Sequence, residues 1–134
     1  MQPDDAALAN VRLQKARECL QGAEVEIAAN LFKNSANRSY YCIFHAMRAV
    51  LAFDRFDSKK HSGVISAIHK DYIRTGIFSK DFSKIIDNAF EVRNESDYDD
   101  LYIVSKEKVV EQLENAKTFL EAVEKYVNEK IQTP

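Results

Sequence analysis

The sequence contains little cysteine, glycine or proline and no tryptophan. Its two cysteines, Cys19 and Cys42, have no paired spacing and lie in helical patterns, so we expect reduced thiols. No window approaches the roughly 18 apolar residues of a membrane span, and the first ten residues have neither a basic flank nor an apolar stretch. These absences favour a cytoplasmic protein that does not enter a membrane.

An excess of basic charge is also missing. The 19 Lys and Arg residues face 21 Asp and Glu residues, which gives a formal net charge of −2. A chain of this charge has no global positive field for non-specific nucleic-acid binding, so any contact with RNA must be local. The sequence shows no DNA groove reader, and it predicts no metal site and no cofactor.

What the sequence does contain is a high apolar content with a helical period. Hydrophobic residues make up 46% of its 134 residues, and a domain of this size buries roughly two-thirds of its unfolded surface. Apolar residues recur at three- and four-residue steps, which predicts five helices and no strand of comparable strength. We expect one domain over residues 1–134, an all-α up-and-down bundle with helices near 4–31, 35–53, 62–72, 79–97 and 106–128.

Single residues at the helix boundaries predict where helices begin and end. Asn34 or Ser35 is expected to cap the second helix and Ser79 the fourth one, because their side chains accept hydrogen bonds from free N–H groups. The last helix is expected to follow Ser105. Gly76 is placed to end the third helix in a left-handed conformation. The charged, non-periodic segment DRFDSKKHSG is expected to be a loop that crosses the end of the bundle.

The second helix carries polar residues in an otherwise apolar segment, RSYYCIFHAMRA. Arg38, Tyr41, His45 and Arg48 follow one another at steps of three, four and three, so they line one helix face. An unpaired buried guanidinium costs several kcal/mol, so these side chains need acidic partners or a solvated cleft. We expect Asp97 and the acidic end of the fourth helix to meet them.

The second polar feature is the segment EVRNESDYDD, residues 91–100. Arg93 lies on the stripe that faces the core, and Asp97 one turn later is its nearest candidate partner. One interpretation is structural: this pair closes a bundle end, the arginines of the second helix reach outward, and His45 bonds to a carbonyl or a tyrosine. The other is functional: a polar cleft of the second and fourth helices accepts a phosphate through arginine forks.

The blocks RSYYCIFHAMRAVL, KKHSGVI, RTGIF and VRNESDYDD together resemble the HEPN superfamily, in the branch of small stand-alone proteins typically encoded beside minimal nucleotidyltransferases. The similarity spans roughly residues 8–128, and the ordered combination is more specific than any one block. It implies an all-α bundle that dimerises, with the second and fourth helices contributing to a cleft near the dimer axis. It also implies a place in toxin-antitoxin, abortive-infection or other defence-like modules.

Active members of this superfamily are metal-independent ribonucleases marked by Arg, four to six residues, then His. Arg93 and Asn94 match the opening of that motif, but Tyr98, Asp99 and Asp100 occupy the histidine positions. The reaction needs a group that titrates near pH 7, and tyrosine is a poor general base. The departure favours a nucleotide or RNA cleft with a degenerate nuclease motif, formed by Arg38, Tyr41, Arg48, Asn94, Asp97 and Tyr98.

Two histidines are candidates for the missing base. His45 shares its helix face with two arginines, which would keep it neutral and able to accept a proton. His61 follows two lysines at a helix start, where capping or loop packing is the simpler interpretation. With Arg93 as the group that stabilises the phosphate, His45 or His61 would complete an alternative function, a metal-independent ribonuclease.

The resemblance also raises covalent modification. Some HEPN partners of nucleotidyltransferases are silenced by AMP transfer to a tyrosine just past the motif histidine. That position is Asp100 in this sequence, and Tyr98 and Tyr102 flank it. These two tyrosines are therefore the candidates for modification.

Three functions stay open at the level of sequence. The first is a HEPN homodimer, enzymatically weak, that acts as the partner of a minimal nucleotidyltransferase and binds nucleotide or RNA. The second is the ribonuclease, and the third is an oligomerisation scaffold in which every polar residue is structural. A scaffold predicts that Arg93→Ala lowers stability by several kcal/mol without changing any binding.

Overall fold

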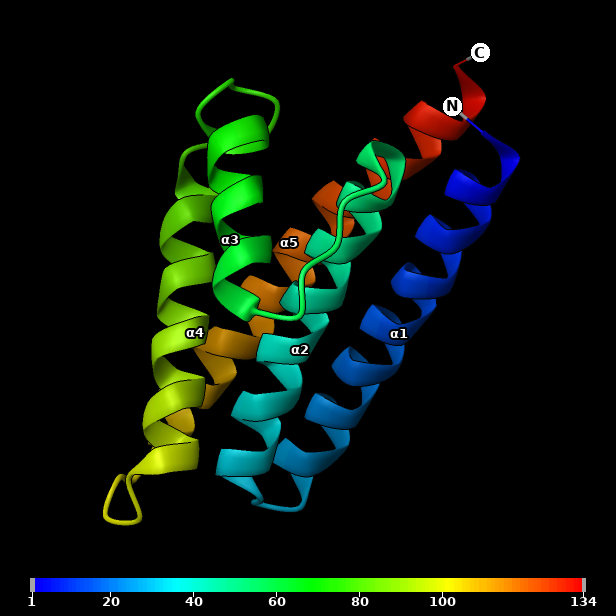
Figure 1. Ribbon diagram of the computed structural model, residues 1–134. Helices are drawn as coiled ribbons and strands as arrows, with labels where there is room; N and C mark the ends of the chain where they lie inside the picture. Colours follow the sequence, from blue (N-terminus) through cyan, green and yellow to red (C-terminus); the bar gives the residue numbers. More distant parts are fainter. Residues whose placement is uncertain (1, 134) are drawn as a thin grey trace.

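The computed structural model describes residues 2–133, a bundle of helices with short connections (Figure 1). In chain order these are α1 (Pro3–Ala28), α2 (Phe32–Leu51), α3 (His61–Ile68), α4 (Asp81–Tyr98) and α5 (Lys106–Gln132). A 3-10 turn, η1 (Ala52–Asp54), extends α2, and a π-helical turn, η2 (His69–Ile73), extends α3. Between residues 2 and 133 there is no strand, and the predicted all-α bundle is confirmed. None of these helices is long and apolar enough to cross a membrane.

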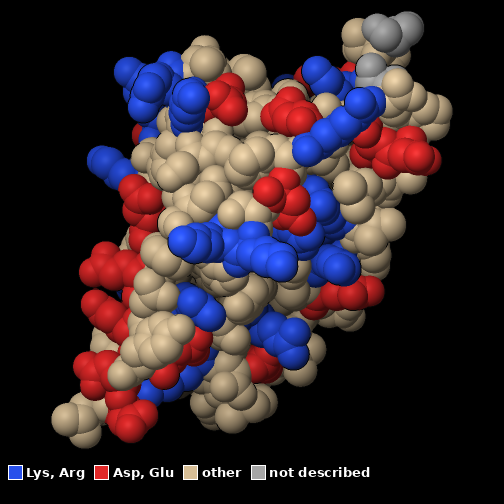
Figure 2. Space-filling view, in the orientation of Figure 1, with Lys and Arg blue, Asp and Glu red and all other residues tan. Residues whose placement is uncertain are grey.

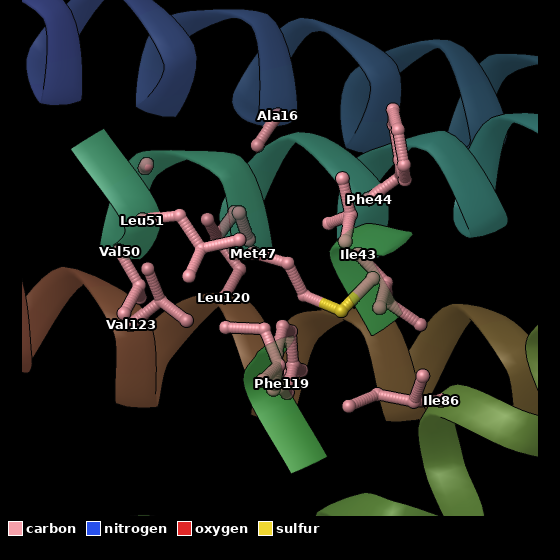
Figure 3. Close-up of a cluster of buried hydrophobic side chains, with 14 of the residues drawn as sticks. Ala16, Ile43, Phe44, Met47, Val50, Leu51, Ile86, Phe119, Leu120 and Val123 are labelled. Atoms are coloured by element: carbon pink, nitrogen blue, oxygen red, sulfur yellow. The ribbon is translucent and has the colours of Figure 1, made fainter. Parts of the chain in front are cut away.

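The central helix is α2, with α1 on one side, α3 and α4 on the other, and α5 behind it (Figure 1). Ile43 and Met47 of α2 are completely buried. In Figure 3 they lie in one cluster with Phe119 of α5 and Ile86 of α4, while Ala16 approaches α2 from α1. A helix that is apolar on several faces packs inside a bundle, as the sequence of α2 indicated.

The left-handed conformation predicted for Gly76 is confirmed, with a φ of 84°. Ser79 accepts a hydrogen bond from the Asp81 N–H at 3.2 Å, but Lys80 occupies the N-cap position, so α4 begins one residue later than predicted. Ser105 caps α5, because it accepts a backbone hydrogen bond of 3.1 Å from Lys108.

Neither Asn34 nor Ser35 caps α2, because that helix already begins at Phe32. Asn30, with a left-handed φ of 61°, turns the chain so tightly that α2 starts earlier than its polar residues suggest.

The connection from η1 to α3, residues 55–60, does not cross the end of the bundle as predicted. The chain reverses at Arg55, which has a left-handed φ of 54°, and then runs back along the outer face of α2 (Figure 1). Arg55 pairs with Asp5 of α1 at 3.4 Å, and the Phe56 N–H donates to the Leu51 carbonyl at 3.2 Å. We call this segment the returning loop. It places the start of α3 beside the middle of α2.

Candidate functional site

Arg93 of α4 lies between α4 and α2, where only 17% of its side chain is exposed. We call Arg93 and the residues that it contacts the Arg93 site. Arg93 Nη2 donates to the Tyr41 hydroxyl at 3.3 Å, and its Nη1 donates to the Asn94 side-chain oxygen at 3.2 Å. Its Nε is 3.0 Å from Asp97 Oδ2, which confirms the i,i+4 ion pair that the spacing predicted. The two atoms are close enough for an ion pair but are not aligned for a hydrogen bond. The carboxylate therefore balances the charge, while both terminal nitrogens contact neutral oxygens.

The Arg93 guanidinium lies close to two tyrosine rings of α2. Its central carbon is 5.7 Å from the Tyr40 ring centre and 5.8 Å from the Tyr41 ring centre. At this distance the ring faces attract a cation. The rings meet edge to face at 5.2 Å, and Tyr40 is completely buried, so they cannot turn away easily. The position of the guanidinium is thus fixed by α2 as well as by α4.

His61, the first residue of α3, joins the same group of rings. Its Nδ1 is 2.7 Å from the Tyr40 hydroxyl, and its ring stacks on Phe44 with the centres 4.2 Å apart. Burial lowers the pKa of His61, and the nearby charge of Arg93 lowers it further. Since one ring nitrogen is held by Tyr40, Nε2 is the nitrogen through which this neutral imidazole can exchange a proton with a ligand.

Arg48 of α2 forms a fork with Asp57 of the returning loop. Its Nε and Nη2 donate to the two carboxylate oxygens at 3.2 and 3.0 Å. Arg12 of α1 donates to the same carboxylate through Nη2 at 3.3 Å, and to the Arg48 carbonyl through Nη1 at 2.8 Å. The hydrogen bonds from Arg48, together with the Ser58 N–H and the charge of Arg12, hold the pKa of Asp57 below its ordinary value.

His45 lies beside this pair of arginines. Arg48 Nη1 is 3.3 Å from His45 Nδ1, and because a guanidinium can only donate, Nδ1 is the unprotonated nitrogen. Burial first, and then Arg48, Lys15 and Arg12, lower the pKa of His45 to about 4. The prediction that His45 is held neutral is confirmed. Burial is the main cause of the lowered pKa. Of the two arginines expected to act on His45, Arg48 contributes to the shift and Arg38 does not.

This pKa predicts how stability depends on pH. The folded chain disfavours protonated His45, so its contribution is complete above the unfolded value near 6.5 and is lost as the pH falls towards about 4. Wild type should therefore lose on the order of 2 kcal/mol more unfolding free energy than His45→Gln over this window. Urea unfolding at a series of pH values measures both slopes. Identical slopes would show that His45 is not held neutral by the fold.

The expectation that Asp97 meets the whole polar stripe of α2 is wrong. Asp97 pairs with Arg93, whereas Arg48 pairs with Asp57. Arg38 pairs with Glu26 of α1 at 3.2 Å, and 56% of its side chain is exposed. The polar face of α2 is in contact with α1 and the returning loop as well as α4. Its arginines therefore pair with acidic residues of α1 and of the returning loop.

The tyrosines near the end of α4 do not contact Arg93. Tyr98 is 78% exposed, so the structure does not bring it together with Tyr41 and Arg93 as a cleft residue. Tyr102 is half-buried against a small apolar cluster at the start of α2 and α5. Burial and the neighbouring Glu95 raise the pKa of Tyr102.

Two neighbouring pockets open along the outer face of α2. One holds about 460 Å³ and is lined by Phe44, Arg48, Asp57, Ser58, Lys59 and His61; we call it the Asp57 pocket. The other holds about 390 Å³ and lies between α1 and α2, around Arg38, Tyr41 and His45.

Figure 2 shows Lys and Arg side chains gathered across the middle of this face, with acidic side chains along the α4 edge. Positive charge is thus local. Over residues 2–133 no group of three or more potential metal ligands occurs.

Sequence reasoning missed four residues of this region: Arg12, Tyr40, Phe44 and Asp57. The burial of Arg12 could have been predicted, because Arg12 stands three residues after Ala9 on the apolar stripe of α1. In the structure it is 7% exposed. Tyr40 and Phe44 resembled ordinary core residues. Asp57 lies in a segment without a period, so only the fold places it against α2.

Comparison with known proteins agrees with this architecture. The family model of the HEPN domain matches residues 9–126. A UPF0332 protein of Thermotoga maritima is 32% identical over 87% of this chain and 88% of its own length. Another, from Archaeoglobus fulgidus, is 34% identical over 88% of this chain and 94% of its own. A Methanocaldococcus jannaschii protein named "Putative toxin MJ0142" is 28% identical over 86% of this chain and 78% of its own. The chain belongs to the HEPN domain family.

Proposed function

We propose that this chain is the HEPN partner of a minimal nucleotidyltransferase in a toxin-antitoxin or defence-like module, and that its Arg93 site binds a phosphate of RNA or of a nucleotide. The bonding of Arg93 supports the proposal most. Its terminal nitrogens contact the neutral oxygens of Tyr41 and Asn94 at 3.3 and 3.2 Å. A phosphate accepts stronger, charge-assisted bonds from both nitrogens of a guanidinium, so it can replace these neutral acceptors.

The surroundings of Arg93 suit this exchange. Asp97 keeps a carboxylate on the Nε side, which leaves the edge of the two terminal nitrogens for a ligand. The Arg93 guanidinium already lies within 5.8 Å of the centres of the Tyr40 and Tyr41 rings, so little side-chain freedom is lost when a phosphate binds. Once released by Arg93, the Tyr41 hydroxyl can itself donate to a phosphate oxygen.

The biological role in the proposal is supported by the relatives. Two M. jannaschii relatives carry names that begin "Putative toxin", and the family resemblance extends over most of the chain. A toxin of this kind needs a partner that neutralises it, and the sequence resembles the HEPN branch found beside nucleotidyltransferases. We propose a homodimer as the active form, in which the two Arg93 sites lie near the dimer axis.

One observation favours a second candidate, the metal-independent ribonuclease. His61 contacts Tyr40 at 2.7 Å, and Tyr40 also lies against Arg93, so a neutral imidazole and a guanidinium share one aromatic support. In this reaction His61 Nε2 would take the proton of a 2′-hydroxyl, and the 2′-oxygen would attack the adjacent phosphorus while Arg93 stabilises the charge of the pentavalent phosphate. The bond between phosphorus and the 5′-oxygen would then break, and the 5′-oxygen would leave with a proton from water, giving a 2′,3′-cyclic phosphate. His45 is less suitable, because Arg48 already occupies its unprotonated nitrogen.

Incubation with RNA in EDTA separates the two candidates. Purified protein is mixed with single-stranded and structured RNA, and both binding and cleavage are followed. The partner proposal expects binding without cleavage. Cleavage that disappears in both Arg93→Gln and His61→Gln, but persists in His69→Gln, would establish the ribonuclease instead.

Co-expression with a minimal nucleotidyltransferase encoded beside this chain tests the partner itself. We expect a stable complex in light scattering. With ATP, we expect the Tyr98 hydroxyl to lose its proton and attack the α-phosphate, which adds one adenylyl group and releases pyrophosphate; the Tyr98 side chain is far more exposed than that of Tyr102. Tyr98→Phe should abolish the addition, and Tyr102→Phe is the matched control. Failure to form a complex at micromolar concentration would count against the partnership.

A further inference from the structure

Two arginines from different helices converge on one carboxylate that belongs to a loop. Arg48 binds both oxygens of Asp57, and Arg12 binds one of them. The arginine side chains are 19% and 8% exposed, whereas that of Asp57 is 47% exposed. The two cations are therefore fixed parts of the bundle, and the anion between them comes from its surface.

The position of Arg12 does not depend on Asp57 alone. Arg12 is anchored by its 2.8 Å hydrogen bond to the Arg48 carbonyl, and α1 and α2 pack along each other (Figure 1). Burial and the charge of Arg48 lower the pKa of Arg12, which shows that the two guanidiniums oppose each other. This arrangement requires an anion at the point where their donors meet.

The carboxylate of Asp57 also borders open space. It lines the Asp57 pocket of about 460 Å³ together with Arg48, Lys59 and His61. A group that enters from solvent reaches Arg48 and Lys59 through this pocket. Asp57 itself is held by the returning loop, whose residues are mostly exposed and follow no helical period, so the loop can yield more easily than the helices beneath it.

We propose that Arg12, Arg48 and Lys59 form an oxyanion site for a phosphate monoester group, and that the carboxylate of Asp57 occupies this site until a ligand displaces it. The inference rests on the proposed function, to which it adds a second phosphate subsite besides the Arg93 site. A phosphate dianion carries twice the charge of the carboxylate and offers three oxygens to the same donors, so it competes with Asp57 on favourable terms.

Neutralising Asp57 tests the site. Asp57→Asn leaves the two guanidiniums without their anion, so it should bind inorganic phosphate about tenfold more tightly than wild type, a difference of roughly 1.4 kcal/mol. Calorimetric titration of inorganic phosphate and, separately, of 5′-AMP measures the gain and distinguishes free phosphate from a nucleotide phosphate as the preferred ligand. The gain should disappear in Asp57→Asn combined with Arg48→Gln.

Asp87→Asn is the matched control, since Asp87 is also an exposed aspartate, paired with His69 at 3.1 Å on another face. If Asp57→Asn binds neither ligand more tightly than wild type and this control, the subsite is overturned. If Asp57→Asn folds poorly, inorganic phosphate can be titrated into wild type instead. Displacement of Asp57 must then shift the Ser58 amide resonance, because the Ser58 N–H donates to Asp57 at 2.9 Å. An unshifted resonance also overturns the subsite. RNA binding that depends on Arg93 would survive either failure, so the two proposals can fail separately.

Discussion

Replacing Arg93 with lysine is expected to weaken RNA binding about tenfold, a loss of roughly 1.4 kcal/mol, while leaving the fold intact. Lysine keeps a positive charge beside Asp97. It lacks the planar fork that reaches two phosphate oxygens and lies over the rings of Tyr40 and Tyr41. Fluorescence anisotropy with a short single-stranded RNA measures the change, at one fixed salt concentration because phosphate binding depends steeply on ionic strength.

Arg17→Lys is the matched control for this variant. Arg17 pairs with Glu124 of α5 at 3.2 Å and is 43% exposed, so it resembles Arg93 in chemistry but does not face α4. Its replacement should leave the affinity for RNA unchanged. Equal losses in both variants would indicate a diffuse effect of charge, and unchanged binding in Arg93→Lys would contradict phosphate recognition at Arg93.

The stability of Arg93→Ala separates a binding residue from the structural pair of a scaffold. The side chains of Arg93 and Asp97 are 17% and 37% exposed, so water screens their interaction. We therefore expect the unfolding free energy to fall by about 1 kcal/mol rather than by the several kcal/mol of a fully buried pair. A larger loss, with RNA binding unaffected, would support the scaffold.

Phe119→Ala is expected to lower the free energy of unfolding by about 3–5 kcal/mol, the largest change in stability that we predict. Phe119 is completely buried and meets the Phe82 ring edge to face at 5.4 Å. Figure 3 places it in the cluster of α2, α4 and α5 side chains. Its removal opens a cavity where three helices meet. The expected loss is a large fraction of the unfolding free energy of a typical domain, which is roughly 5–15 kcal/mol. Urea unfolding followed by circular dichroism measures the difference.

Phe56→Ala provides the comparison, because Phe56 lies on the returning loop and is 39% exposed. We expect it to change the unfolding free energy by about 1 kcal/mol or less. If both phenylalanines gave similar losses, the core would not be centred on the meeting point of α2, α4 and α5.

The helices were predictable because each buries a continuous apolar stripe. The periodicity of α1 and α5 gave their extent, and Ser105 marked where α5 begins. The start of α2 was not predictable from capping residues, since the left-handed Asn30 decides it. A single residue with unusual backbone angles leaves no periodic trace in the sequence.

The candidate site was predictable where its contacts are local. Arg93 and Asp97 are one helical turn apart, so their pairing followed from spacing alone. Arg38 and Arg48 instead find their partners, Glu26 and Asp57, on α1 and on the returning loop. Such contacts depend on how helices pack and where a loop runs.

The returning loop also explains how α2 holds a histidine and arginines among apolar side chains. It covers the polar face of α2 with its own carboxylate, so Arg48 is paired and His45 stays neutral beside it. The same loop sets His61 against Tyr40 and Phe44. On this polar face the charge of Arg48 is therefore paired and His45 is neutral.

The most direct test of phosphate binding between α2 and α4 is a titration of single-stranded RNA into isotope-labelled protein, followed by nuclear magnetic resonance of backbone amides and arginine side chains. We predict that the largest shifts occur at the Arg93 side chain, Tyr41 and His61, and that they disappear in Arg93→Gln. Shifts concentrated on the outer face of α5, with Arg93 and Tyr41 unchanged, would contradict the account.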